Sequence, residues 1–194
     1  MELYEKFFVT ALKKEVERLG IVYTPIEVVD FILHSANEVL QDEFGRCLSD
    51  EGVHVLDPFT GTGIFLTRLL QSNIIQDTDL ERKYREELHA NEIVLLAYYI
   101  ATVNIEETFR GQRGVDKGYE PFNGIVLTDT FNLNKKDDTT LFPKEWLPDN
   151  NKRAERQQKL PIQVIVGNPP WSAGQKKSTD DNPNVEYPDL LRIK

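Results

Sequence analysis

Short apolar runs that alternate with helical segments constrain the fold of this chain more than any other feature. The runs cover residues 53–56, 87–91, 124–127 and 162–166, of which the second is the weakest strand candidate. A strand buried on both faces is nearly continuous in apolar residues, and strands that alternate with helices form a parallel sheet. The pattern therefore predicts an α/β fold with a parallel sheet and helices on both faces.

Helical segments precede and separate these runs. Apolar residues at helical spacing predict an N-terminal helix within residues 1–20, followed by a second helix. We expect Thr24 to cap the second helix, with Pro25 at its first position and Glu27 completing a capping box. Further helices are predicted at residues 64–70 and 93–104. Within a long polar insertion, we expect either a helix around residues 151–159 or partial disorder.

The composition indicates one ordinary globular domain. Hydrophobic residues make up 40% of the 194 residues and charged residues 28%, which does not suit a disordered chain. The longest strongly apolar run, residues 93–103, is too short to cross a bilayer, and the N-terminus lacks the layout of a signal peptide. Cys47 is the only cysteine, which excludes an internal disulfide and a cysteine-based metal cluster. We expect a cytoplasmic protein without a metal, in which His34, His54 and His89 are structural or surface residues.

The first predicted strand ends in a glycine-containing turn, Asp57-Pro58-Phe59-Thr60-Gly61-Thr62-Gly63. A strand end, a glycine turn and a helix start leave backbone N–H groups free to face a ligand, and glycine lets a ligand approach the main chain closely. The turn lacks the Gly-Lys-Ser/Thr ending of a phosphate-binding loop. Taken alone, it is equally compatible with a cofactor site and with a tight strand-to-helix connection.

The fourth predicted strand ends in a second polar segment, Asn168-Pro169-Pro170-Trp171. Proline fixes the backbone and lacks an N–H group, which leaves carbonyl oxygens without partners. The Asn168 amide oxygen and the Pro169 carbonyl can then accept both hydrogens of an NH₂ group, while Trp171 offers a flat face to a base. The alternative is a loop around a buried tryptophan, but functional residues of open α/β sheets lie at the carboxyl ends of strands. This placement favours a substrate site.

In this order, the two segments resemble the motifs of the amino-methyltransferases that act on exocyclic nitrogens of DNA bases. Residues 22–31 resemble the Thr-Pro motif that adenine-N6 DNA methyltransferases carry ahead of the glycine turn. Residues 167–184 resemble the type I-like single-polypeptide (type ISP) restriction–modification enzymes. The resemblance covers about residues 20–194 and implies the Rossmann-like fold of methyltransferases that use S-adenosyl-L-methionine (AdoMet).

The resemblance assigns roles to individual residues. Around the methionine end of AdoMet it places Asp57, Phe59, Thr60, Gly61 and Gly63, with Thr24 at the carboxylate. Around the nucleoside it places Glu92 at the ribose hydroxyls, Asp129 at the adenine amino group and Phe131 against the ring. The alternatives are a helix cap for Thr24, a solvated charge for Glu92 and a core position for Phe131. The resemblance assigns catalysis on a flipped-out adenine to Asn168, Pro169, Pro170 and Trp171. At the position of Trp171, most relatives have Tyr or Phe.

The resemblance also implies parts that these residues do not supply. A complete fold of this type has seven strands, so the sheet is expected to stop after its fourth strand. Residues 21–194 would then be a partial AdoMet-binding and catalytic domain that follows the 1–20 helix. Double-stranded DNA would be bound through a recognition domain missing from this chain, with further restriction–modification domains or subunits and no membrane. The net charge of −9 agrees, because DNA phosphates are bound by Lys and Arg. We therefore expect little methylation by the 194 residues alone.

Two other functions stay open. The chain can be an AdoMet-binding fragment without catalysis of its own. It can also be an amino-methyltransferase that acts on RNA bases or on a glutamine side-chain amide of a protein. The Thr-Pro motif ahead of the glycine turn favours DNA over the last two substrates.

Overall fold

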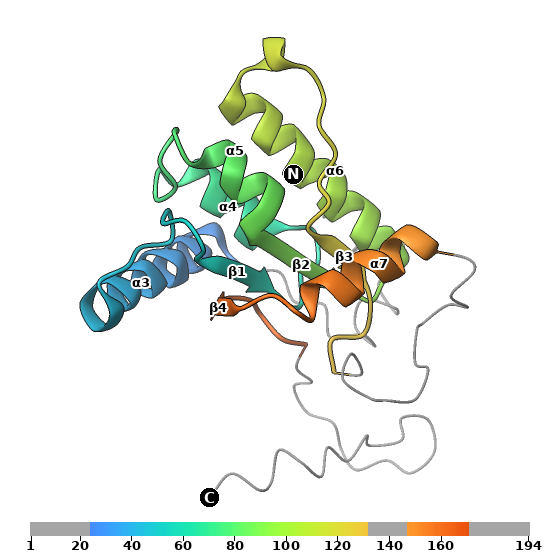
Figure 1. The fold of residues 1–194 in the computed structure, drawn as a ribbon, viewed down its shortest axis with the longest axis horizontal. Helices are drawn as coiled ribbons and strands as arrows, with labels where there is room; N and C mark the ends of the chain where they lie inside the picture. The colour runs from blue at the N-terminus through green and yellow to red at the C-terminus, as the bar shows by residue number, and fades with distance from the viewer. Residues whose placement is uncertain (1–23, 132–146, 171–194) are drawn as a thin grey trace, which may run out of the picture. The chain divides into compact units, whose positions relative to one another are not determined.

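The computed structural model describes residues 24–131 and 147–170, and all of these except Pro170 fall within one compact unit. The helix predicted within residues 1–20 lies outside the described residues. The elements, in chain order, are α3 (Ile26–Phe44), β1 (His54–Asp57), α4 (Ile64–Gln71), α5 (Leu80–Arg82), a π-helical turn (Lys83–Glu87), β2 (Leu88–Glu92), α6 (Leu95–Arg113), a 3₁₀ turn (Val115–Lys117), β3 (Ile125–Leu127), α7 (Pro148–Gln157) and β4 (Ile162–Ile165) (Figure 1).

The four strands form a parallel sheet in the order β3-β2-β1-β4. All four predicted apolar runs are strands, and the weakest candidate is β2, whose five residues are all buried. The chain moves outward from β1 to β3 and then crosses back to the other side of β1. In open α/β sheets, ligands bind outside the carboxyl ends of the strands where the order reverses in this way. The strand order therefore predicts a ligand site outside the carboxyl ends of β1 and β4.

Alternating side chains give the sheet two faces. One face packs its apolar residues, such as Val55, Ala90 and Ile125, into the core with α4 and α6. The opposite face carries His89 and Val126, which line a small pocket together with Gln157 of α7. Helices therefore lie on both faces, and the α/β fold predicted from the sequence is confirmed (Figure 1).

The beginning of α3 differs from the prediction. Pro25, rather than Thr24, occupies the N-cap position, and no side chain caps the helix. The Pro25 carbonyl accepts hydrogen bonds from the N–H groups of Val28 and Val29, at 3.0 and 3.1 Å. The capping box predicted for Thr24 and Glu27 is therefore wrong, because the Thr24 hydroxyl contacts a distant segment instead.

The segment from Leu80 to Glu87 folds into helical turns that the apolar pattern does not predict. Its inward-facing side chains include the fully buried Lys83, whose Nζ donates to the carbonyls of Asp50 and Val53 and pairs with Glu87 at 2.8 Å. Charged residues that are buried in pairs look like solvated residues in the sequence. The second half of α6 is also missed by the apolar pattern, because the helix continues to Arg113 through polar residues and buries Glu106.

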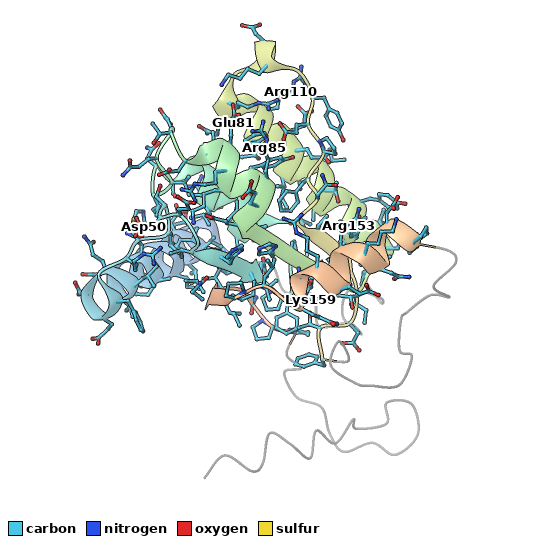
Figure 2. The ribbon with its side chains drawn as sticks, viewed as in Figure 1. Asp50, Glu81, Arg85, Arg110, Arg153 and Lys159 are labelled. Carbon is cyan, nitrogen blue, oxygen red and sulfur yellow. The ribbon has the colours of Figure 1, made fainter. Side chains whose placement is uncertain are left out.

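Ion pairs join the segment before β2 to the segment that follows α6 and its 3₁₀ turn. Arg85 pairs with Glu81 at 3.0 Å and with Glu120 at 2.6 Å, and Figure 2 shows Glu81 and Arg85 next to each other.

In the described ranges, no helix combines the length and the apolar character that crossing a membrane requires.

Helix α7 protects the outer edge of β3. The buried Asn150 side chain accepts a hydrogen bond from the Leu127 N–H at 2.8 Å and donates one to the Leu127 carbonyl at 3.0 Å. Arg153 donates to the Ile125 carbonyl at 3.1 Å. Side chains of one helix thus replace the partners that a neighbouring strand would supply, which removes an exposed strand edge.

Replacing Asn150 with Ala is expected to lower the free energy of unfolding by about 2–4 kcal/mol, because two buried backbone groups lose their partners. Urea denaturation followed by circular dichroism measures this change. The exposed neighbour Asp149, changed to Ala, is the control and is expected to alter stability by less than about 0.5 kcal/mol. Equal stability of the two variants would contradict the role given to Asn150.

Candidate functional site

The glycine turn and the Asn-Pro-Pro segment meet at the point where the strand order reverses. Asp57 ends β1, and Gly167 and Asn168 follow β4, which pairs directly with β1. A Cβ atom on Gly167 would lie 2.8 Å from Asp57 Oδ1 and 3.3 Å from Pro58 Cδ. Glycine at this position therefore allows the backbone just before Asn168 to rest against the Asp57 carboxylate.

Asp57 is fully buried at the centre of this site. Its Oδ1 accepts a hydrogen bond from the Phe59 N–H at 3.1 Å, and its Oδ2 has no hydrogen-bond partner in the described part of the chain. Burial raises the pKa of Asp57 to about 7, opposed by the Phe59 hydrogen bond and reinforced by the charge of Glu92. A buried acceptor without a partner is costly unless a ligand supplies the donor.

The backbone of the glycine turn is hydrogen-bonded within the chain. Besides Phe59, the N–H of Thr60 donates to the Asn91 carbonyl, that of Gly61 to Glu92 Oε2 at 2.7 Å, and that of Gly63 to the Thr60 carbonyl. The prediction that these N–H groups face a ligand is therefore wrong for all four. The reason is that carboxylates and β2 accept the first three of these donors, and the Thr60 carbonyl of the turn itself accepts the fourth.

The two glycines of the turn are required by conformation and packing. Gly61 and Gly63 have φ angles of 56° and 87°, in the left-handed region that side chains disfavour. A Cβ on Gly63 would also lie 3.2 Å from Ile105 Cγ1 and 3.4 Å from Ala101 Cα. Gly63 therefore brings α6 close to the start of α4.

Three further residues stabilise the site and were not predicted from the sequence. Asn104 Nδ2 donates to the Thr62 carbonyl at 2.8 Å, and Thr130 Oγ1 donates to the Pro58 carbonyl at 2.7 Å. Gly167 is the third. Thr130 and Gly167 adjoin predicted site residues, which is a signal that could have identified them, but nothing in the sequence indicates Asn104.

Glu92 lies at the end of β2 and is 8% exposed. Its Oε1 accepts hydrogen bonds from the N–H groups of Ile93 and Val94 at 2.9 and 2.8 Å, and its Oε2 accepts from Gly61. Burial raises the pKa of Glu92, while these three donors oppose the shift. The alternative of a solvated charge is therefore wrong.

Asp129 and Phe131 follow β3 at the same edge of the sheet. The half-buried Asp129 accepts a hydrogen bond from the Phe131 N–H at 3.0 Å through Oδ1. The Phe131 ring is 46% exposed and packs against Phe59, with ring centroids 5.3 Å apart. The structure therefore does not place Phe131 in the core, which was the alternative to a ligand contact.

Asn168 contacts Thr24. Its Nδ2 donates a hydrogen bond to Thr24 Oγ1 at 3.1 Å, although the two residues are 144 positions apart. Pro169 and Pro170 are exposed, and Trp171 lies outside the described residues. The structure thus brings together Thr24, Asp57 and Asn168, whose proximity no local pattern predicts.

The site is rich in hydrogen-bond acceptors. Three carboxylates, Asp57, Glu92 and Asp129, lie at or just after the ends of three neighbouring strands. Such a set suits a ligand that carries N–H and O–H donors or a positive charge, and it repels phosphate. In residues 24–131 and 147–170, no cluster of three or more His, Cys, Asp or Glu side chains is arranged to hold a metal ion.

An open pocket of about 300 Å³ lies near the end of β3. It is lined by Leu95, Tyr98, Tyr99, Leu127 and residues 147–150 and 153, none of which is a predicted site residue. On the opposite face of the sheet, His54 Nδ1 and His89 Nε2 lie 3.0 Å apart. Neither feature contains Asp57 or Asn168.

Comparisons with known proteins identify the family of the chain. The family model of N-6 DNA methylases matches residues 1–190, whereas no curated protein matches the sequence. One similar solved structure is LlaBIII, an ATP-dependent type ISP restriction–modification enzyme bound to DNA, with 54% identity and a TM-score of 0.78 over 90% of this chain and 12% of that chain.

Two further structures are similar over most of the chain. A nuclease-deletion mutant of the type ISP enzyme LlaGI, in complex with a DNA substrate mimic, has 48% identity and a TM-score of 0.81 over 98% of this chain and 16% of that chain. DrdV in complex with DNA has 44% identity and a TM-score of 0.76 over 87% of this chain and 16% of that chain. The chain thus spans 12–16% of the length of these proteins, and its four-stranded sheet is consistent with a partial Rossmann-like methyltransferase fold. It belongs to the N-6 DNA methylase family, close to the type ISP restriction–modification enzymes.

Proposed function

We propose that this chain transfers a methyl group from AdoMet to N6 of adenine in DNA. It would do so as the cofactor-binding and catalytic part of a longer restriction–modification enzyme, called the complete enzyme below. The observation that carries the proposal is the packing of Gly167 against Asp57, which joins the Asn-Pro-Pro segment to a buried carboxylate whose Oδ2 has no partner in the described residues. A substrate amine at Asn168 would then lie next to a ligand held by Asp57.

The residues present fit AdoMet. Asp57 Oδ2, buried and without a partner in the described residues, suits the ammonium group of the methionine end. Glu92 and Asp129 supply acceptors for the ribose hydroxyls and the adenine amino group, and Phe59 and Phe131 supply an aromatic surface. When bound, AdoMet supplies a methyl group on a positively charged sulfur, which suits a site lined by carboxylates and not by phosphate-binding cations.

The Asn-Pro-Pro segment would hold the target amine. The Asn168 side-chain oxygen and the Pro169 carbonyl accept the two N6 hydrogens, which directs the nitrogen lone pair away from the adenine ring. Trp171 would stack on the flipped base. As N6 bonds to the methyl carbon, the bond from that carbon to sulfur would break, and its electron pair would remain on the sulfur of the demethylated product. N6 would then release one proton to solvent. Positioning and electrostatic stabilisation by these acceptors account for the rate.

DNA would be recognised by other parts of the complete enzyme. The three similar structures are DNA complexes of much longer chains, whereas this chain carries a net charge of −9. Non-specific affinity for DNA depends on basic side chains, and flipping a base requires contacts to the surrounding duplex. We therefore propose that the 194 residues bind AdoMet by themselves but need the recognition region to methylate DNA.

Changing Glu92 to Ala is expected to weaken binding of AdoMet and of its demethylated product roughly 10- to 100-fold, because a buried charged acceptor is lost. Isothermal titration calorimetry on the 194-residue chain measures the affinity. Glu107 on α6, which is exposed and pairs only with Arg110 in the described contacts, provides the matched control when changed to Ala.

The results of this titration distinguish an error in the role of Glu92 from an error in the proposed function. Unchanged affinity in the Glu92 variant, together with binding by the parent chain, would show that Glu92 does not line the cofactor site. If the parent chain binds no AdoMet, the proposed function itself is wrong. Transfer by the complete enzyme to RNA or to protein glutamine, and not to DNA, would correct the substrate.

A further inference from the structure

We infer that Thr24 is a positioning residue that fixes the orientation of the Asn168 carboxamide. The inference rests on the proposed function, in which the Asn168 oxygen accepts a hydrogen from the target amine. The observation that carries it is the 3.1 Å hydrogen bond from Asn168 Nδ2 to Thr24 Oγ1.

The Thr24 hydroxyl is available for this contact because the helix does not use it. Thr24 precedes α3, whose N-cap is Pro25, and no side chain caps the helix. Thr24 is only 9% exposed, and α3 is anchored in the core through the fully buried Val29 and Leu33. The hydroxyl is therefore held at a fixed place, in contrast to a surface threonine.

The contact matters because the backbone at Asn168 leaves one degree of freedom open. Gly167 rests against Asp57, which places the Asn168 backbone. The side chain can still turn its carboxamide over, which exchanges the positions of the oxygen and the NH₂ group. A flipped carboxamide would present N–H donors to the N–H donors of the target amine.

A hydroxyl that accepts from Asn168 Nδ2 selects the productive orientation. With the NH₂ end held at Thr24, Oδ1 occupies the opposite end of the planar carboxamide. Thr24 also keeps its own hydroxyl proton, because one hydroxyl can accept and donate together. It can thus donate to the carboxylate of AdoMet while it holds Asn168, which would couple an occupied cofactor site to a correctly oriented Asn168.

The test compares Thr24→Val, which removes the hydroxyl but keeps the shape, with Thr24→Ser, which keeps the hydroxyl. Thr102→Val is the control, because the Thr102 hydroxyl donates only to the Tyr98 carbonyl within α6 in the described contacts. Nuclear magnetic resonance on the 194-residue chain follows the side-chain NH₂ signals of Asn168, identified by their loss in Asn168→Ala. The methyl-transfer kinetics of the complete enzyme are measured for the same variants.

Thr24→Val is expected to move one Asn168 NH₂ proton upfield, since its hydrogen bond is lost, whereas Thr24→Ser and Thr102→Val leave it in place. In the complete enzyme, Thr24→Val is expected to lower kcat roughly tenfold or more with KM for DNA unchanged, and Thr24→Ser to restore most of kcat. An unmoved Asn168 signal, or a normal kcat in Thr24→Val, would overturn the inference. If the parent enzyme transfers no methyl group, the proposed function fails first, and the inference falls with it.

Discussion

Replacing Asn168 with Ala is expected to lower methyl transfer by the complete enzyme on the order of 100-fold or more. The Asn168 oxygen acts on the target amine as its charge changes, and loss of one such acceptor in the transition state has effects of this size. Cofactor affinity is expected to stay within roughly twofold of the parent, because the Asn168 oxygen is proposed to act on the target amine and not on AdoMet. Tritiated methyl transfer and calorimetry measure the two quantities.

The matched control for Asn168→Ala is Asn37→Ala. Asn37 accepts a hydrogen bond from the Leu48 N–H at 2.8 Å and belongs to the structural frame around α3. This variant is expected to lose stability but not turnover at a temperature where it is folded. Near-normal turnover in Asn168→Ala would contradict the mechanism, and a large loss of cofactor affinity would place Asn168 in the cofactor site instead.

Replacing Asp57 with Asn is expected to stabilise the protein while it weakens AdoMet binding. The buried carboxyl has a pKa of about 7, against an ordinary value of 3.8, because burial disfavours its charge. The folded state binds this proton more tightly than the unfolded state, so the parent loses stability as pH rises from about 4 through 7. An Asn side chain carries no such charge, so the stability gained by the substitution increases as pH rises through 7.

Urea denaturation at pH 5 and pH 8 tests the sign of this effect. The stability difference between Asp57→Asn and the parent should be larger at pH 8 than at pH 5, whereas the exposed Asp42→Asn should show no such dependence. Affinity for AdoMet should fall in the Asp57 variant, since a neutral amide cannot pair with the ammonium group. A variant that is less stable than the parent at pH 8, or that binds AdoMet normally, would show that Asp57 is not held for the cofactor.

The local pattern of apolar residues in the sequence predicts the helices and strands that are buried through apolar side chains. The run before Asp57 and the glycine turn after it indicate β1 and α4, because each combines an apolar sequence with a clear boundary. Pattern fails where charged residues are buried in pairs, as Lys83 and Glu87 are. It also fails at Thr24, whose local sequence suits a helix cap but whose hydroxyl contacts Asn168.

Topology predicts the site in outline but not in its contacts. Residues after β1 and β4 are expected to meet, because these strands flank the reversal of the strand order. The hydrogen bonds of the glycine turn to Glu92, and the braces from Asn104 and Thr130, depend on side-chain positions that a sequence does not contain. The expectation of free N–H groups in the turn was wrong for this reason.

The central claim is methyl transfer to adenine N6, and the most direct measurement identifies the methylated nucleoside. The complete enzyme is incubated with unmethylated DNA and tritiated AdoMet, and the DNA is then digested to nucleosides and separated by chromatography. The account predicts that the label coelutes with N6-methyldeoxyadenosine and is lowered on the order of 100-fold or more in the Asn168→Ala variant. Label in N4-methyldeoxycytidine, or equal label in the parent and the Asn168→Ala variant, would contradict it.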